Sequence, residues 1–284
     1  MPGAELSGAV PTPPARPLAL QEIAVCMRYS FFGMSGWQSG FSKQKELLFD
    51  PARLGHRLAL LKSVALASLQ GQTDRAFHLF VLTSEDLPDL ALRQLTDACE
   101  ESLGSRSVTI APKPPGRARK HLREFLARRY AGGRSVQVVL DDDDGLATDY
   151  MATLRALLAE LDGDAAIDSS RPYFLSFANG YGLVFEPGQT GAPALFRHRY
   201  PHINLGLAMI GRADGENLFS IDHLAAPRKY GSRIVSGAPM WVRSVHGLND
   251  SRVAVTDRWT PVPDWRDDAE VLARFPFLRR LGLG

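Results

Sequence analysis

Four short apolar runs, each followed by a segment with helical spacing, constrain the fold of this chain most strongly. The runs are of buried-strand type, and the intervening segments repeat apolar residues every three or four positions. The first helix has a clear start, because Asp50 can cap it and Pro51 suits its first turn. Strands that alternate with helices pair as a parallel sheet covered by those helices. The expected strands are 23–27, 77–82, 108–110 and 136–140, and the expected helices are 50–71, 92–103, 122–130 and 148–161.

The pattern changes after Gly163, where strand-like runs follow one another. The dipeptide Asn179-Gly180 between two such runs predicts a β-hairpin, because both residues tolerate the positive φ of a tight turn. This part of the chain is therefore expected to be α+β. The runs are 173–177, 181–185, 205–210 and 241–245.

These patterns predict one α/β catalytic domain over residues 22–284. Residues 22–162 form its Rossmann-like, mainly parallel half, and residues 163–284 form the α+β half and a C-terminal tail. Residues 1–21 contain five prolines and little periodic apolar content, which is typical of a flexible leader.

Composition excludes several classes of protein. The chain is 45% hydrophobic and 23% charged, which is ordinary for a globular protein, and its formal net charge of +2 gives no reason to expect nucleic acid as a partner. Cys26 and Cys99 are too few for a disulfide framework, so a reducing compartment fits best. No apolar stretch approaches the ~20 residues that a membrane-spanning helix requires. We therefore expect a cytoplasmic protein without a transmembrane segment.

Four consecutive carboxylates, Asp141 to Asp144, follow the fourth strand. In open α/β sheets ligands bind beyond the carboxyl ends of strands. Two ionised carboxylates ~6 Å apart repel by roughly 3 kcal/mol at an effective dielectric constant of ~20, and a divalent cation would offset that repulsion. Oxygen ligands suit Mg²⁺ or Mn²⁺, which keeps coordination positions for substrate phosphate. If side chains alternate, Asp141 and Asp143 share one metal ion while Asp142 and Asp144 face elsewhere.

Two other interpretations of the acidic run stay open. It could be a solvated turn whose last members cap the next helix. Asp142-Asp143-Asp144-Gly145 also resembles the signature of haloacid-dehalogenase-like phosphatases. That signature normally has Thr or Val where Leu146 stands and opens its domain near the N-terminus. A third alternative is a non-catalytic module of the same fold that binds a metal ion or a sugar.

A set of motifs spread over roughly residues 23 to 260 resembles a family of bacterial rhamnosyltransferases. The combination is specific, although each piece alone is weak. The resemblance implies a GT-A fold, a nucleotide-diphosphate-sugar donor, a metal ion at an Asp-x-Asp motif, and inversion at the anomeric carbon, in polysaccharide or glycoconjugate synthesis. The motifs are residues 28–33, Trp37, residues 69–74, Phe77, residues 81–84, residues 140–146 and residues 242–251.

The resemblance also implies site residues. Asp141 and Asp143 are the motif pair, and Arg28 and Ser30 lie on the donor side. Four aspartates leave the register of the motif uncertain by one residue, so Asp142 is a further candidate donor contact.

Glycosyl transfer also needs cations for the diphosphate and a base for the acceptor proton. Arg117 and Lys120, at a helix start, are candidate donor contacts or else belong to a solvated basic face. Asp222 and Asp250 are the candidate bases, with Asp222 preferred. His246 is either a third metal ligand, a diphosphate contact or a hydrogen-bonded core histidine.

The expected acceptor is a carbohydrate, free or lipid-linked. The tail from Val271 to Leu281 alternates apolar and arginine residues. It either touches an anionic membrane surface or packs on the domain.

Overall fold

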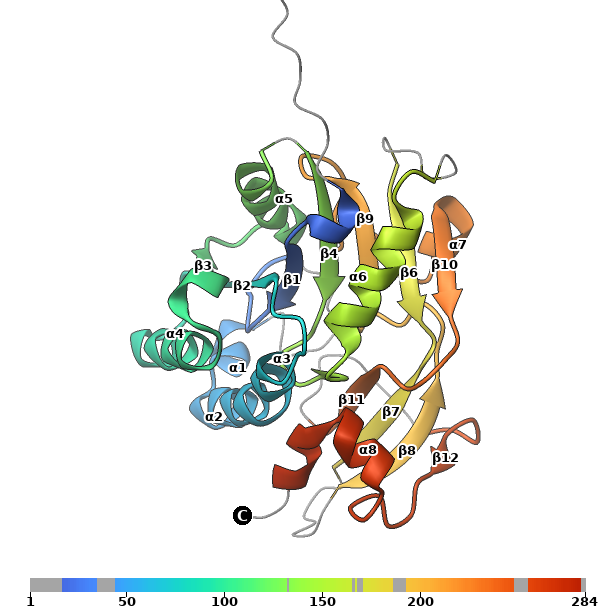
Figure 1. Cartoon of the computed structure of the whole chain (residues 1–284). Coiled ribbons are helices and arrows are strands. Elements are labelled where there is room, and N and C mark those ends of the chain that lie inside the picture. Colours follow the sequence, from blue (N-terminus) through green and yellow to red (C-terminus); the bar gives the residue numbers. More distant parts are fainter. Residues whose placement is uncertain are drawn as a thin grey trace, which may run out of the picture.

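Two β-sheets form the framework of the protein (Figure 1). The computed structural model describes residues 17–34, 44–131, 133–164, 167, 171–185, 193–247 and 255–281. The first sheet has seven strands in the order β10-β6-β9-β4-β1-β2-β3, and the second has five in the order β12-β8-β7-β11-β5. The second sheet lies below the first in Figure 1, where the arrowhead of β4 points toward it.

The first sheet is parallel except for one strand. β3, β2, β1 and β4 pair in parallel, β9 is antiparallel to both β4 and β6, and β10 is parallel to β6. Every residue of β1 and β2 is buried, because helices cover both faces. The predicted mainly parallel α/β fold is confirmed. The strands are β1 Ile23–Arg28, β2 Phe77–Ser84, β3 Val108–Lys113, β4 Arg134–Val139, β6 Tyr173–Phe177, β9 Ala208–Arg212 and β10 Gly231–Val235.

Alternate residues of the central strands enter different cores. Val25 of β1 belongs to the larger cluster with α2, α4 and α6, whereas Cys26 packs with α5 on the opposite face. Helix α7 closes a third, smaller cluster on β6 and β9. The α-helices are α1 Lys45–Leu48, α2 Pro51–Leu60, α3 Ala67–Gln70, α4 Asp89–Leu103, α5 Ala118–Arg129, α6 Tyr150–Leu161, α7 Ala226–Lys229 and α8 Ala269–Arg274. The other helical segments are η1 Leu18–Leu20, η3 Leu61–Leu66, η4 Ser105–Ser107 and η5 Pro276–Arg280.

The helix predicted for residues 50–71 has an irregular middle. It begins as expected, with Asp50 accepting a hydrogen bond from the Arg53 amide at 2.9 Å and Pro51 in the first turn. Between α2 and α3, however, the segment η3 is π-helical, with one extra residue per turn. Such a segment changes which side chains face the sheet before and after it.

The predicted hairpin at Asn179-Gly180 is wrong. β6 belongs to the first sheet and β7 to the second, so the chain crosses between sheets at Ala178 instead of turning back. The glycines are needed for close packing: a Cβ atom on Gly180 would lie 2.1 Å from Trp241, and one on Gly182 would lie 1.8 Å from Trp259. The strands of the second sheet are β5 Gly145–Leu146, β7 Asn179–Val184, β8 Ala194–Arg199, β11 Trp241–Val245 and β12 Thr260–Pro261.

Both ends of the described chain pack on this framework. Leu18, which we assigned to the leader, is 1% exposed, and its amide donates to the Asp162 carboxylate at 3.0 Å. The folded part therefore begins before residue 22. In the tail, Phe275 and Leu278 are completely buried, so these side chains are core residues and do not form a membrane-facing surface. Among the described residues, no helix is both long and apolar enough to cross a bilayer.

Candidate active site

The carboxyl ends of β1 and β4 bring Arg28 and Asp141 together. The register pairs Cys26 with Val139, so Arg28 and Asp141 stand at equivalent positions two residues further along. Arg28 Nη2 lies 3.7 Å from Asp141 Oδ1, with the aspartate side chain 30% exposed. Burial raises the pKa of Asp141, and the Arg28 charge opposes that rise. Two residues predicted on the donor side therefore meet at one edge of the sheet.

The acidic run links the two sheets, because β4 ends before it and β5 begins directly after it. Its four side chains alternate between solvent and interior, although the run is a turn closed by a 3.3 Å bond from the Asp144 amide to the Asp141 carbonyl. Asp142 and Asp144 are 1% and 6% exposed. The even-numbered members therefore face the protein interior, and the odd-numbered ones are only partly buried.

The two buried aspartates have firm partners. Arg57 of α2 donates from both Nε and Nη2 to the Asp142 carboxylate, the first bond measuring 2.9 Å. Asp144 Oδ1 accepts from the Ser244 amide of β11 at 2.8 Å. Burial, together with the charges of Asp143 and Asp141, raises the pKa of Asp144 well above its ordinary value. Asp142 was predicted as a donor contact, but its position on Arg57 keeps it from the surface of the site.

Asp143 and His246 form a contact that joins the turn to the end of β11. His246 Nε2 lies 2.9 Å from Asp143 Oδ2, and the two side chains are 5% and 13% exposed. Burial alone would raise the pKa of Asp143, but the bond to His246 and the Arg57 charge outweigh it and lower that pKa. The His56 ring of α2 packs edge-on against His246, with centroids 5.0 Å apart.

The remaining predicted residues lie around this centre. Ser30 follows β1 with a left-handed φ of 44°, and its hydroxyl accepts from Arg53 Nη1 at 3.4 Å. Arg117 stands at the start of α5, where Met34 exchanges backbone hydrogen bonds with Gly116 and Ala118. That helix start is therefore held against the loop after β1.

Lys120 is placed differently. Its side chain is 74% exposed and lies 4.0 Å from Glu124, one turn further along α5. This matches the solvated basic face that we considered as an alternative for this residue.

Of the two candidate bases, only Asp222 lies within the described residues; Asp250 lies outside them. Asp222 is exposed, and its Oδ1 accepts from the Leu224 amide at 2.9 Å. Its loop also carries Phe219, whose ring centre lies 5.0 Å from the Arg28 guanidinium carbon. The loop that bears Asp222 is thus in contact with the donor-side arginine.

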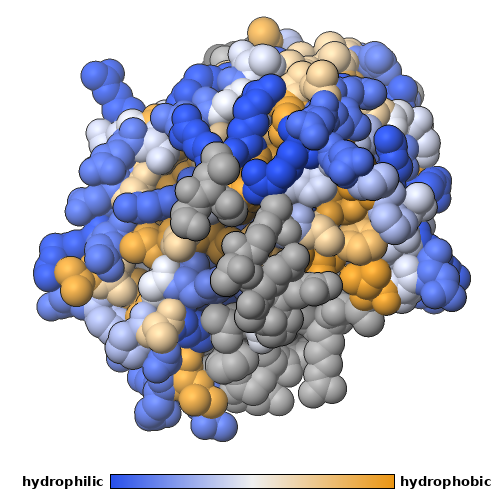
Figure 2. All heavy atoms as spheres, turned by 90° about the horizontal axis from the view of Figure 1, so that it is seen from below, coloured by the Kyte–Doolittle hydropathy of each residue, from blue (hydrophilic) through white to orange (hydrophobic). Residues whose placement is uncertain are grey.

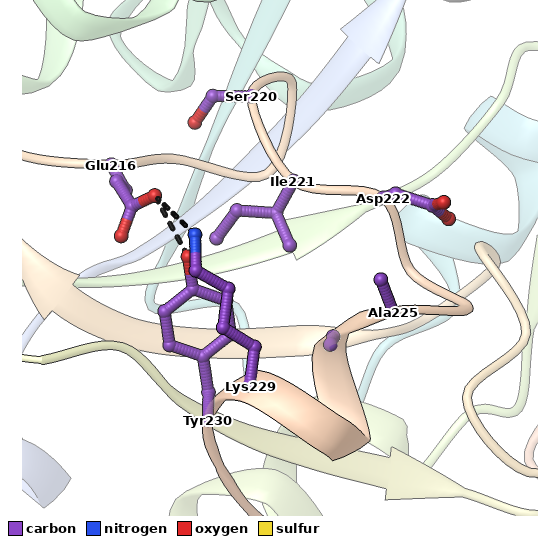
Figure 3. A pocket seen from close by; sticks show the side chains of 8 residues that line it. Glu216, Ser220, Ile221, Asp222, Ala225, Lys229 and Tyr230 are labelled. Atoms are coloured by element: carbon purple, nitrogen blue, oxygen red, sulfur yellow. Dashed lines mark hydrogen bonds and ion pairs between the residues drawn. The ribbon is translucent and has the colours of Figure 1, made fainter.

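A pocket of about 180 Å³ lies beside this loop and α7 (Figure 3). Glu216 accepts from the Tyr230 hydroxyl at 2.7 Å and lies 3.7 Å from Lys229 Nζ. In Figure 3 the Asp222 carboxylate points away from these three side chains. Asp222 is one of the residues that line this pocket, although its carboxylate does not point at Glu216, Lys229 or Tyr230.

Three arginines near the acidic turn were missed as site residues. Arg53 and Arg57 are 3% and 4% exposed, and the charge of Arg243 in β11 partly opposes the rise that burial causes in the pKa of both Asp141 and Asp144. A sequence signal existed for two of them, because Arg53 and Arg57 occupy the same helical stripe as buried Leu54 and Leu61. Arginines on an apolar stripe indicate a buried partner.

The chemistry of the turn suits a hard divalent cation. Asp141 Oδ1 is buried without a hydrogen-bond donor, and the Asp143 side chain, which contacts His246 through Oδ2, is 13% exposed. Within the described part of the chain, no three His, Cys, Asp or Glu side chains converge as a complete metal cage. Mg²⁺ and Mn²⁺ are commonly held by one or two carboxylates plus substrate phosphate, so two aspartates are a sufficient protein contribution.

Figure 2 looks at the molecule from below, on the side of the second sheet. Hydrophilic residues predominate along the border of this face, and smaller hydrophobic patches lie between them. Among the residues coloured there, no single hydrophobic surface covers the face. A ligand that binds on this side therefore meets a mixed surface.

Comparison with known proteins identifies the family. Residues 21–258 match the family model described as putative rhamnosyl transferase. A search of curated proteins gave no match. Among solved structures, S. aureus TarS is similar at 10% identity and a TM-score of 0.38, over 79% of this chain and 37% of that chain. A shorter TarS structure, 1–349, gives 10% identity and a TM-score of 0.41, over 79% and 60% of the two chains.

The chain spans 37% and 60% of the two TarS chains, less than two thirds of either, and at these TM-scores the likeness identifies no function. The family match covers most of the sequence, and the strand order agrees with the GT-A-like architecture that the resemblance implied. This match favours sugar transfer over the phosphatase interpretation. The chain therefore belongs to the putative rhamnosyl transferase family.

Proposed function

We propose that this protein is a glycosyltransferase that moves a sugar, rhamnose being the family's candidate, from a nucleotide-diphosphate donor to a hydroxyl of a carbohydrate or lipid-linked acceptor. The observation that carries the proposal is the ion pair of Arg28 with Asp141 at the carboxyl ends of β1 and β4, with Asp143 two residues further along the turn. The Arg28 guanidinium can contact the negatively charged diphosphate, and the two partly exposed carboxylates can hold the metal ion bound to that diphosphate.

Asp141 and Asp143 would hold Mn²⁺ or Mg²⁺, and His246 would fix the orientation of Asp143. When bound, the ion neutralises charge that develops on the diphosphate leaving group. Arg28 at the end of β1 and Arg117 at the start of α5 would contribute further positive charge to the same group. In this assignment His246 acts through its hydrogen bond to Asp143 and is not a third ligand.

Asp222 is the proposed base. Its carboxylate is exposed, and its loop contacts Arg28 through Phe219, so an acceptor bound there would lie next to the donor. Asp222 would take the acceptor hydroxyl proton while that oxygen bonds to the anomeric carbon. The bond from this carbon to the diphosphate breaks with its electrons going to the leaving oxygen. A single displacement of this kind inverts the anomeric configuration.

The test is a screen of the purified protein against nucleotide-diphosphate sugars with Mn²⁺ or Mg²⁺, following thermal shift and released nucleotide diphosphate together. We expect one donor to stabilise the protein and to release diphosphate slowly, only with metal ion present. Asp143→Ala should lose both signals, whereas Asp97→Ala, at an exposed position on α4, should keep them. Metal-independent release, or release of inorganic phosphate from simple monoesters, would contradict the proposal.

A further inference from the structure

Helix α2 carries two arginines that are buried although they lie on a helix whose opposite side is exposed. Arg53 and Arg57 are four residues apart, so they project from the same face. Their exposures are 3% and 4%, values at which a guanidinium must be paired to avoid a large desolvation cost. Their partners therefore indicate what this face of α2 is for.

Arg57 is paired with the middle of the acidic turn. Its Nε and Nη2 atoms bond to different oxygens of Asp142, which fixes the plane as well as the position of that carboxylate. Asp142 lies between Asp141 and Asp143 and is itself 1% exposed. Holding the middle side chain inward sets the direction in which both neighbours point.

Arg53 is paired with the loop after β1. Its Nη1 atom donates to the Leu48 carbonyl at 3.1 Å and to the Ser30 hydroxyl at 3.4 Å. Ser30 has a left-handed backbone, which a serine adopts only where its surroundings stabilise it. Arg28, two residues earlier, is the residue that meets Asp141. The same face of α2 therefore contacts both the acidic turn and the loop after β1, the two loops of the proposed donor site.

We propose that Arg57 is a positioning residue for Asp141 and Asp143. Its two hydrogen bonds to the Asp142 carboxylate hold the turn so that Asp141 and Asp143 face one cation. This inference rests on the proposed metal-dependent function and adds a residue that touches neither metal ion nor sugar. An alternative role, stabilisation of the fold alone, makes a different prediction when both partners are replaced together.

The experiment compares Arg57→Met, Asp142→Leu and the double variant in full-length protein. Mn²⁺ affinity is measured by electron paramagnetic resonance with the metal ion alone, and unfolding is measured by thermal melts. Each single variant leaves a buried charge without its partner, so both should melt earlier. The double variant replaces the pair by apolar side chains and should regain the melting temperature.

Positioning predicts that Mn²⁺ affinity falls about 10–100-fold in Arg57→Met, as for other side chains that orient metal ligands, and that the double variant does not restore it. Arg57→Lys keeps the positive charge but cannot form the paired hydrogen bonds to Asp142, so it should also bind Mn²⁺ more weakly than the wild type. Arg212→Met removes an exposed ion pair with Asp214 and serves as the control.

The outcomes separate the two proposals. A double variant that binds Mn²⁺ as tightly as the wild type overturns the positioning role and leaves the glycosyltransferase mechanism intact. A wild type that turns over a donor but binds no Mn²⁺ or Mg²⁺ overturns both the metal dependence and this inference. A wild type that binds Mn²⁺ with the expected variant pattern but consumes no donor supports the role of Arg57 and overturns the donor assignment.

Discussion

The two sheets meet at the acidic turn but are completed in different ways. In the first sheet, β1 ends in Arg28, which pairs with Asp141 just after β4. The second sheet is closed by tryptophan rings lying on glycines, with Trp241 over Gly180 and Trp259 over Gly182. The difference suggests that changes at the end of the first sheet alter catalysis more than stability, and that changes on the face of the second do the reverse.

The strongest test on the first-sheet side is Asp222→Asn. Asparagine retains the oxygen that accepts from the Leu224 amide, so the loop should keep its shape. Loss of the proposed base should lower kcat by about 10²–10⁴-fold, with the melting temperature unchanged. Steady-state kinetics with the identified donor provide the measurement. The matched control is Asp214→Asn, at an exposed residue on the neighbouring turn, and equal kcat values in both variants would remove Asp222 from the mechanism.

On the second-sheet side, Gly182→Ala should mainly destabilise the fold. Its new Cβ atom would meet the Trp259 ring at 1.8 Å, so the ring or the strand must move. We expect a loss of about 3 kcal/mol in unfolding free energy, or roughly 6–12 °C in melting temperature. Gly237→Ala, with nothing within 4 Å of the new atom, is the control. If Trp259→Leu does not recover part of the loss in the double variant, the proposed steric cause is wrong.

A smaller effect concerns His198, stacked on Trp259 with centroids 4.2 Å apart. Burial, assisted by the Arg243 charge, lowers its pKa to about 4 from the model-peptide value of 6.5. As the pH falls from 6.5 to 4, the unfolded chain binds a proton that the folded one does not, so stability is lost across that window. His198→Phe should reduce this loss by on the order of 1 kcal/mol, allowing for solvent screening of a half-buried ring. Urea unfolding at pH 7 and pH 4.5 measures it; identical pH dependence in both proteins would contradict the assignment.

The smallest expected effect is that of Gly55→Ala, which tests whether the stability of α2 and Mn²⁺ affinity are independent. Gly55 lies inside α2 with nothing within 4 Å of an added Cβ atom. Gly55→Ala should therefore stabilise the helix by about 0.5–1 kcal/mol. Because the arginine face of α2 is untouched, Mn²⁺ affinity should not change, and a parallel change in affinity would show that helix stability and the site are coupled.

Much of this architecture could be predicted from local patterns. Strands such as β1 and β4 are buried almost throughout, and their alternation with helices defined the parallel sheet. The exposure of Asp141 and Asp143 also followed from side-chain alternation, although the aspartates lie in a turn. The position of a carboxylate at a strand end is local information, which explains why the acidic turn was recognised.

Other features depend on partners distant in sequence. Arg57 and Asp142 are 85 residues apart, so nothing near either residue identifies the pair. The Asn179-Gly180 dipeptide was misread for a related reason: the need for glycine came from a ring on another strand, not from backbone conformation. Sequence patterns indicate the local conformation that a residue favours, whereas the residue types at these positions depend on contacts with side chains distant in sequence.

Gly145, the first residue after the acidic turn, is covered by the ring of Phe277, and the Thr148 amide donates to the Arg274 carbonyl at 3.0 Å. The cover for this turn is therefore translated more than 100 residues after the aspartates themselves. A nascent chain can pair β1 with β4 long before that cover exists. The turn that carries the proposed metal ligands should consequently be completed late in biosynthesis.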